Sequence, residues 1–168
     1  MDCKQLYQYL KSEEMAKRLF LLFNLGNERF AVTTELITEI TPLVELTRIP
    51  RTESYICGLF NYRGETIPVV DTSMLLFNQP HSRKICTRII ILTRVKGDII
   101  SRIGLIAEKV NKTESFDTDL INRHVLTQKH SPYLGKTLTD EQGEIQIIDL
   151  EKFMPDDFDD IKSLAMHS

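Results

Sequence analysis

Short apolar runs separated by turn-forming residues recur along most of this chain, and they have the length of β-strands rather than of helices. Gly26-Asn27, Arg63-Gly64-Glu65 and Lys96-Gly97-Asp98 each lie between two such runs and predict hairpin turns. The pattern predicts strands at residues 19–25, 29–33, 37–43, 55–62, 66–70, 87–95, 99–107, 109–116, 133–139 and 145–148. About ten short strands with regularly spaced turns favour barrels or a sandwich over a parallel α/β sheet, so we expect an all-β fold.

Two short helices are expected from the positions of aspartate. Asp71 precedes the apolar stretch 72–77 and Asp149 precedes the stretch 150–154, so each fits the N-cap of a short helix. The alternative for Asp71 is a catalytic carboxylate, but no histidine or second acid accompanies it in the motif. Residues 4–17 also have a helical spacing of apolar side chains and predict a short N-terminal helix.

The stretch GLFNYRGETIPVVD, residues 58–71, is the most informative in the chain. It places a charged turn between two apolar strands and contains no catalytic chemistry. Gly64 allows the positive φ of a tight turn, and Pro68 lacks the N–H group that a central strand would donate. The second strand is therefore expected at a sheet edge or a bulge, where another protein can dock. The motif indicates recognition rather than catalysis.

Two segments of the chain resemble each other. GETIPVVDTSMLLF (64–77) and GEIQIIDLEKFM (143–154) share a Gly-Glu turn, an apolar strand, an aspartate cap and an apolar helical end. The similarity predicts a duplicated unit. Its alternative explanation is that any strand followed by a capped helix has this pattern.

Length and hydropathy limit the class of protein. A chain of 168 residues can form one domain with a full core or two small domains packed together. It contains no run of ~18 apolar residues, and its first segment, 1–18, is too polar for a signal peptide. We therefore expect a cytoplasmic protein that does not insert into a membrane.

Charge is distributed unevenly although the net charge is only −3. Between His81 and Lys112 the chain has eight basic residues and two acidic ones. A basic stretch suits nucleic acid or an acidic protein partner, and it also fits the solvated face of alternating strands. The absence of Trp and an aromatic content of 8% leave few side chains for base stacking, which argues against single-stranded nucleic acid.

The sequence carries no signature of catalysis or of metal binding. The chain has no phosphate-binding loop, dinucleotide fingerprint, zinc-protease helix or nucleophile elbow. Its cysteines, Cys3, Cys57 and Cys86, are widely spaced, and the apolar surroundings of the last two predict small core side chains rather than nucleophiles. The acidic run 156–160 lacks the glycine and glutamate of a calcium loop. The four histidines, His81, His124, His130 and His167, fall in expected loops and the tail, where solvation is usual. We expect no enzyme, no cofactor and no metal.

Five segments together indicate a family. FLLFNLGNERFAV (20–32), LITEITPLVELTRIP (36–50), GLFNYRGETIPVVD (58–71), RIGLIAEKVNK (102–112) and GEIQIIDLEKFM (143–154) follow in the order and spacing of the CheW-like domain, so residues 19–155 resemble that family. The resemblance implies two small five-stranded β-barrels packed side by side, with strands partly exchanged between the sequence halves. It leaves 1–18 as an N-terminal extension and 156–168 as an acidic tail.

The resemblance also implies a function. Members of the family are non-catalytic adaptors that link the cytoplasmic tip of chemoreceptors to the regulatory domain of a CheA-type histidine kinase, in arrays at the membrane. The receptor is expected in the groove between the barrels, and the kinase on an apolar face of one barrel. No nucleic-acid partner is implied.

Particular residues follow from the family motifs. Glu39 and Arg63 match the charged pair beside the receptor groove, and Ile37, Asn61 and Gly64 shape the same surface. The pair either fixes the turn or is an ordinary surface ion pair. Candidates for the kinase-facing patch, or alternatively for the core, are Val44, Leu46, Ile49 and Leu59. Lys129, in the loop 124–132, is a candidate for a second contact.

The chain departs from the family pattern at a few positions. Tyr62 replaces the usual Leu in the turn, and Thr72-Ser73 replaces a common Leu-Arg pair. Glu108 and Lys109 replace an Asp and a small residue. These changes leave open which receptor is recognised and whether the output concerns flagella, pili or surface sensing. Two alternatives are the coupling part of a CheV-like protein, which would need a receiver domain, and an oligonucleotide-binding barrel.

Overall fold

The structure is a computed structural model that describes residues 2, 4–5, 17–117 and 131–153. Nine strands follow in chain order: β1 Lys17–Leu25, β2 Glu28–Thr33, β3 Ile37–Pro42, β4 Ile56–Tyr62, β5 Glu65–Asp71, β6 Arg88–Lys96, β7 Ile99–Asp117, β8 Leu134–Asp140 and β9 Gly143–Ile148. Among these described residues there are also one 3₁₀ turn, Thr34–Leu36, and two short helices, α2 Thr72–Phe77 and α4 Leu150–Phe153. In the described part, no helix has both the length and the apolar character needed to cross a bilayer.

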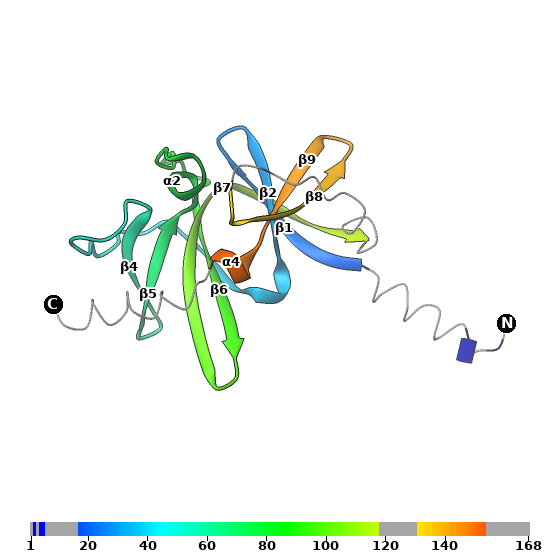
Figure 1. Ribbon diagram of the computed structural model, residues 1–168, viewed down its shortest axis with the longest axis horizontal. Helices are drawn as coiled ribbons and strands as arrows, with labels where there is room; N and C mark the ends of the chain where they lie inside the picture. Colours follow the sequence, from blue (N-terminus) through cyan, green and yellow to red (C-terminus); the bar gives the residue numbers. More distant parts are fainter. Residues whose placement is uncertain (1, 3, 6–16, 118–130, 154–168) are drawn as a thin grey trace.

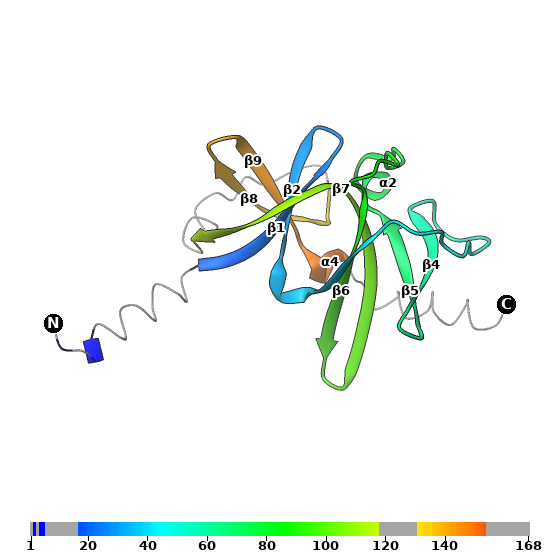
Figure 2. The same ribbon diagram turned by 180° about the vertical axis from the view of Figure 1, so that it is seen from behind.

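Two five-stranded sheets share the long strand β7, which runs between them in Figures 1 and 2. Sheet A has the order β7-β1-β2-β9-β8, with a parallel pairing of β2 and β9. Sheet B has the order β4-β5-β7-β6-β3, with a parallel pairing of β5 and β7. The N-terminal hairpin thus pairs with C-terminal strands. The expected all-β fold of two small units side by side is confirmed.

The strand β7 corrects one expectation from the sequence. Separate strands were predicted at 99–107 and 109–116, but β7 runs without interruption from Ile99 to Asp117. Its first part pairs with β6 and its second part with β1. Lys109, with φ 44°, marks the passage between the sheets. The polar residues Glu108 and Lys109, which interrupt the apolar pattern, therefore mark a change of partner strand rather than a turn.

The edge position expected for β5 is correct only for its first half. Glu65–Pro68 pairs with β4 alone, whereas Val69 and Val70 pair with both β4 and β7, and Asp71 pairs with β7. Pro68 comes just before the first residue that pairs with β7, so its missing N–H costs no ladder bond on that side. A register shift in β4, between Ile56 and Gly58, accommodates the local bend.

Most strands bury both of their faces, which explains the continuous apolar runs in the sequence. The side chains on one face of each sheet pack against one another. The sheet A cluster contains Phe20, Leu22, Ala31, Phe116, Leu138 and Ile145, and the sheet B cluster contains Tyr62, Ile67, Val69, Ile89, Ile91 and Ile106. The other face joins a central cluster of Leu21, Phe23, Leu25, Phe30, Val32, Ile56, Val70, Ile90, Leu92, Ile103, Leu105, Ala107 and Ile148. The two sheets therefore share one core.

The similarity between the sequence halves has a structural counterpart. After each hairpin the capping aspartate returns to the start of that hairpin: Asp71 N–H donates to Tyr55 O at 2.8 Å, and Asp149 N–H to Tyr133 O at 3.0 Å. Both aspartates also cap their helices, as predicted, with Asp71 accepting from Met74 N–H and Asp149 from Glu151 N–H. The repeated contacts favour the duplication over a chance resemblance.

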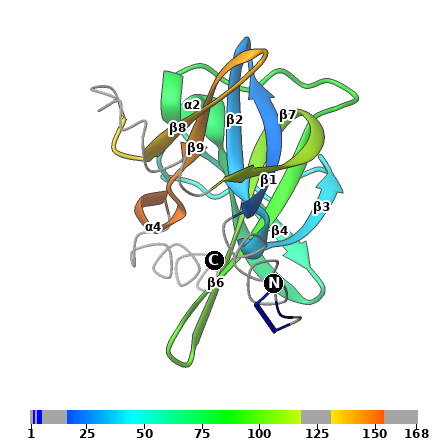
Figure 3. The ribbon, with the colours of Figure 1, turned by 90° about the vertical axis from the view of Figure 1, so that its right-hand side faces the viewer.

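The β6–β7 hairpin extends beyond the sheet that holds it, as the side view shows (Figure 3). β3 pairs with β6 only as far as Leu92, and β5 pairs with β7 from Gly104 onward. Residues 93–102 therefore form a two-stranded ribbon. Its apolar side chains Val95, Ile99 and Ile100 are 65%, 60% and 52% exposed.

We expect Asp140→Asn to remove a contribution to stability that is present at neutral pH and lost in acid. Arg29 on β2 donates to both carboxylate oxygens of Asp140, at 2.7 and 2.6 Å, and this bond lowers the pKa of Asp140 to about 2. Because the folded-state pKa lies below the unfolded value, the contribution is full above about pH 4 and disappears as the pH falls toward 2.

Urea unfolding at neutral pH should show a loss of about 1.5–3 kcal/mol for the variant, and a weaker dependence of stability on pH between 4 and 2. Glu35→Gln is the control, because its partner Arg18 lies in an exposed pair that is worth ~0–1 kcal/mol. Equal losses in both variants would contradict the prediction.

Candidate functional site

Glu39 and Arg63 meet at one end of sheet B, although they lie far apart in the sequence. Glu39 is on β3, and Arg63 lies in the turn between β4 and β5. The Arg63 guanidinium donates to Glu39 Oε2 at 3.0 Å, and the two side chains are 76% and 39% exposed. The structure thus brings together the pair that the sequence motif indicated, at the surface.

The turn that holds Arg63 has a defined conformation. Arg63 and Gly64 both have positive φ, 52° and 86°, as in the two-residue turn that best matches the twist of a hairpin. Asn61 Oδ1 accepts the N–H of Gly64 at 3.0 Å and closes the turn. Three residues of the motif therefore fix the direction in which the arginine leaves the sheet.

Tyr62 contributes a contact that the sequence analysis missed. Its hydroxyl donates to Glu39 Oε2 at 2.8 Å, and the Arg63 guanidinium carbon lies 5.2 Å from its ring centroid. The hydrogen bond to Glu39 raises the pKa of the Tyr62 phenol above its ordinary value. The only sequence signal was that Tyr62 replaces a leucine, which cannot make this bond. Glu39 thus accepts from two donors of the same turn.

Two further contacts connect this end of sheet B to the β6–β7 hairpin. Arg102 on β7 forms an ion pair with Glu65, the first residue of β5. Thr38 and Thr93 share a hydroxyl–hydroxyl hydrogen bond of 2.6 Å. Ile37, the other motif residue on β3, is half-buried against the central cluster. The surface around Glu39 and Arg63 therefore rests on β3, the β4–β5 turn and the β6–β7 hairpin.

The four candidates for an apolar patch are placed differently. Val44 is exposed at 38%, whereas Leu59 is buried at 8%. Leu46 packs against the sheet B cluster and Ile49 against the central cluster. Val44 is thus the member of the set most open to a partner. Lys129 lies outside the described residues.

Asp71 has partners that the sequence analysis did not foresee. His81 was expected in solvent, but its side chain is only 13% exposed, with Nδ1 2.8 Å from Asp71 Oδ2. Burial favours a higher pKa for Asp71, but hydrogen bonds from His81 and Met74 prevail and lower it. The loop after α2 folds back onto the N-cap of that helix, and this places His81 beside Asp71.

Of the two cysteines expected as core side chains, Cys57 packs against the sheet B cluster, whereas Cys86 differs from the expectation. Cys86 is exposed, because the loop before β6 leaves it outside the core. Cys57 is half-buried, and burial raises the pKa of its thiol to about 11. One ligand atom from each of Cys57, Asp71 and His81 lies within 4.8 Å of the others. Since both oxygens of Asp71 already accept hydrogen bonds, the group is explained as a helix cap that anchors the loop.

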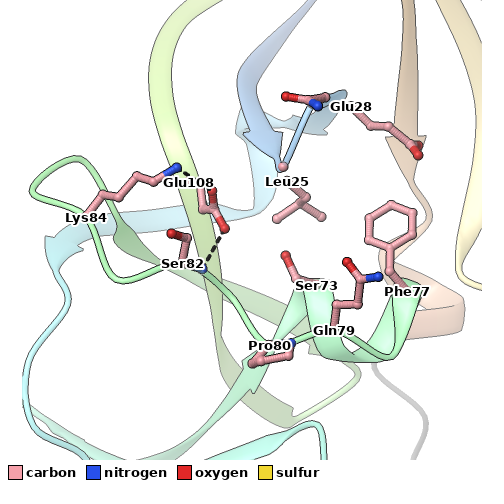
Figure 4. A pocket seen from close by; sticks show the side chains of 11 residues that line it. Leu25, Glu28, Ser73, Phe77, Gln79, Pro80, Ser82, Lys84 and Glu108 are labelled. Carbon is pink, nitrogen blue, oxygen red and sulfur yellow. Dashed lines mark hydrogen bonds and ion pairs between the residues drawn. The ribbon is translucent and has the colours of Figure 1, made fainter.

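A polar cavity of about 560 Å³ lies between the β1–β2 turn, α2 and the loop that follows it (Figure 4). Glu108 is buried at 3% and accepts the N–H of Ser82 at 2.8 Å, with Lys84 Nζ at 4.0 Å. The described lining contains neither cysteine nor histidine. It therefore offers no pairing of a nucleophile with an imidazole base.

Several basic residues of the stretch 81–112 are paired with carboxylates. Arg102 contacts Glu65 and Lys112 contacts Glu114, in addition to Lys84 beside Glu108. This pairing favours solvated strand faces over a continuous surface for phosphates.

Comparison with known proteins identifies related molecules. Residues 19–158 match the model of the CheW-like domain. The chain is 29% identical over 113 residues to the chemotaxis protein CheW of Klebsiella aerogenes, which covers 63% of this chain and 68% of that one. It is 31% identical over 101 residues to the protein FrzA of Myxococcus xanthus, covering 60% and 61%. Its fold is similar to the crystal structure of the scaffolding protein TtCheW from Thermoanaerobacter tengcongensis, with a TM-score of 0.71, 25% identity, and coverage of 83% and 89%.

Proposed function

Because this chain belongs to the CheW-like domain family, we propose that it is a non-catalytic adaptor that couples chemoreceptors to a CheA-type histidine kinase. The resemblance that the sequence motifs indicated is confirmed by the family model and the relatives. The family is one of chemotaxis scaffold proteins. The receptor tip, the kinase regulatory domain and the position of this protein in cytoplasmic arrays beneath the membrane are parts of the proposal.

The observation that carries the proposal is the arrangement around Glu39 and Arg63. The Arg63 guanidinium has five N–H groups and extends from a turn of fixed conformation. It is 76% exposed, so it can still donate to a partner. Glu39 is held in place by the hydrogen bond that its Oε2 accepts from the Tyr62 hydroxyl. A preorganised charged group on a rigid turn suits protein recognition because little conformational entropy is lost on binding.

We assign roles to the motif residues accordingly. Glu39 and Arg63 contact the partner directly, and Ile37, Asn61 and Gly64 maintain the shape of the surface. Val44 belongs to the contact with the kinase, while Leu46, Ile49 and Leu59 support it from the core side. Lys129 remains a proposed second contact. The domain comprises residues 19–155, between an N-terminal extension, 1–18, and an acidic tail, 156–168.

Arg63→Ala is expected to weaken binding to the receptor tip or to the kinase regulatory domain by about tenfold. It should leave the melting temperature within a few degrees, because an exposed ion pair contributes only ~0–1 kcal/mol to stability. The measurement is a pull-down followed by titration calorimetry, with receptor tips and kinase domains encoded in the same genome. The partner that is captured also assigns the output pathway.

Arg18→Ala is the matched control, since Arg18 forms an equally short exposed pair with Glu35 at 3.0 Å on another part of the surface. Unchanged binding in the Arg63 variant, or equal losses in both variants, would remove Arg63 from the interface. Salt-dependent retention of single-stranded DNA by the wild-type protein would instead support the oligonucleotide-binding alternative.

A further inference from the structure

The ribbon formed by residues 93–102 has two faces of different composition. Strand pairing places Arg94 opposite Ser101 and Lys96 opposite Ile99. Because adjacent residues of a strand point to opposite faces, these four side chains share one face. Val95 and Ile100 lie on the other face. The first face therefore combines two positive charges with an isoleucine that is 60% exposed.

This face continues the side of sheet B that packs into the central cluster. Leu92 on β6 and Ile103 on β7 belong to that cluster and directly precede and follow the ribbon. Ser101 is buried at 6% although it lies before the stretch of β7 that pairs with β5. The face is thus an extension of the shared core that ends in basic residues.

The chain itself contains a segment of complementary chemistry. Residues 154–168, which lie outside the described structure, include Asp156, Asp157, Asp159 and Asp160 together with Phe158, Ile161 and Leu164. The segment has a formal charge of −3, whereas the proposed face of the ribbon has the two basic residues Arg94 and Lys96. Opposite charges and apolar side chains on both sides make the two mutually attractive.

Reach and effective concentration favour an intramolecular contact. Fifteen residues extend up to ~50 Å, whereas a domain of this size has a radius of gyration of ~15 Å. A tethered segment also has an effective concentration in the millimolar range, which exceeds that of a separate partner. Two ribbons of like charge would repel each other, which disfavours a second copy as the occupant.

We propose that the acidic C-terminal segment 154–168 docks on the face of the β6–β7 ribbon formed by Arg94, Lys96 and Ile99. The contact is independent of the adaptor function. Thr93 and Arg102, which connect the ribbon to the surface around Glu39 and Arg63, lie on the opposite face of the ribbon, so the proposed contact is separate from that surface.

Zero-length carbodiimide cross-linking of the full-length protein tests the proposal, because it joins only amines and carboxylates in direct contact. Mass spectrometry should identify links between Lys96 and the aspartates of 156–160 within the monomer. Their yield should fall about tenfold in the full-length variant Arg94→Glu, which keeps the Lys96 amine and all four aspartates but reverses a charge on the proposed face. Lys84, which faces Glu108, is the control amine and should give the same product in both proteins.

A charge exchange provides a second arm that does not depend on cross-linking. Hydrogen exchange of the amides of 93–102 should become faster in Arg94→Glu/Lys96→Glu, and should return toward the wild-type rate when the four aspartates are also changed to lysine. Arg18→Glu should leave these amides unchanged. Three results would each overturn the proposal. The first is that the cross-links occur only in a covalent dimer. The second is that amides 93–102 are protected from exchange only when anionic vesicles are added to the protein, and the third is that these amides exchange equally fast in the wild type and in Arg94→Glu/Lys96→Glu.

Discussion

Replacing Gly58 with alanine is expected to destabilise the protein by roughly 3 to 5 kcal/mol. Gly58 lies at the register shift of β4 with φ +147°, a conformation that side chains disfavour. A Cβ atom there would lie 2.5 Å from the carbonyl oxygen of Thr47 and 3.1 Å from Leu46 Cβ. That oxygen accepts the N–H of Leu59 at 2.7 Å, so backbone rather than a flexible side chain would have to move.

The clash and the φ strain can be separated by a control. Gly97→Ala places alanine at φ +61° in the β6–β7 turn, where nothing lies within 4 Å of the added Cβ. It should cost about 1 kcal/mol, from strain alone. Urea unfolding monitored by circular dichroism gives both values. If Gly58→Ala cost no more than Gly97→Ala, the close approach of Thr47 to β4 would be wrong.

Phe30→Ala should cost about 3–5 kcal/mol, because it leaves a large cavity in the central cluster. Phe30 on β2 is 0% exposed and lies between Phe23, with ring centroids 6.1 Å apart, and Phe77, at 6.0 Å. Phe77 belongs to α2, which follows a strand of sheet B. The ring therefore joins the two sheets, and its loss should lower the stability of both.

The expected result is a single unfolding transition at a lower urea concentration, with coincident midpoints for secondary and tertiary probes. Phe77→Ala is the control: its side chain is 37% exposed and it should cost clearly less. Two separate transitions in the Phe30 variant, one of them at the wild-type midpoint, would show that the sheets unfold independently and that the shared core is not cooperative.

Local chemistry made much of the fold predictable. The turn at Arg63-Gly64 and the caps at Asp71 and Asp149 form where the sequence placed them, because each depends on a few neighbouring residues. The continuous apolar runs were harder to interpret. In the run Ile89–Leu92, alternate side chains belong to the sheet B cluster and to the central cluster. Because both faces of the strand are buried, its sequence lacks the alternation of polar and apolar residues that marks a half-exposed strand.

The candidate site was predictable only in part. The motif indicated Glu39 and Arg63, and the structure places them 3.0 Å apart. It did not indicate that the Tyr62 hydroxyl joins them, nor that Leu59 would be buried while Val44 stays exposed. These outcomes depend on how β3 and the segment after it lie against β4, which no local spacing specifies.

The sequence by itself therefore determined most of the strands, the hairpin turns, the helix caps and the family, because these follow from short-range conformational preferences and from one compact motif. Tertiary structure alone decided that β1 pairs with β7 and β2 with β9, that β7 continues through Lys109 from one sheet to the other, and that His81 lies beside Asp71. The physical reason is that these pairings join residues distant in the chain, and they are selected by the burial of two apolar faces at once rather than by any local preference.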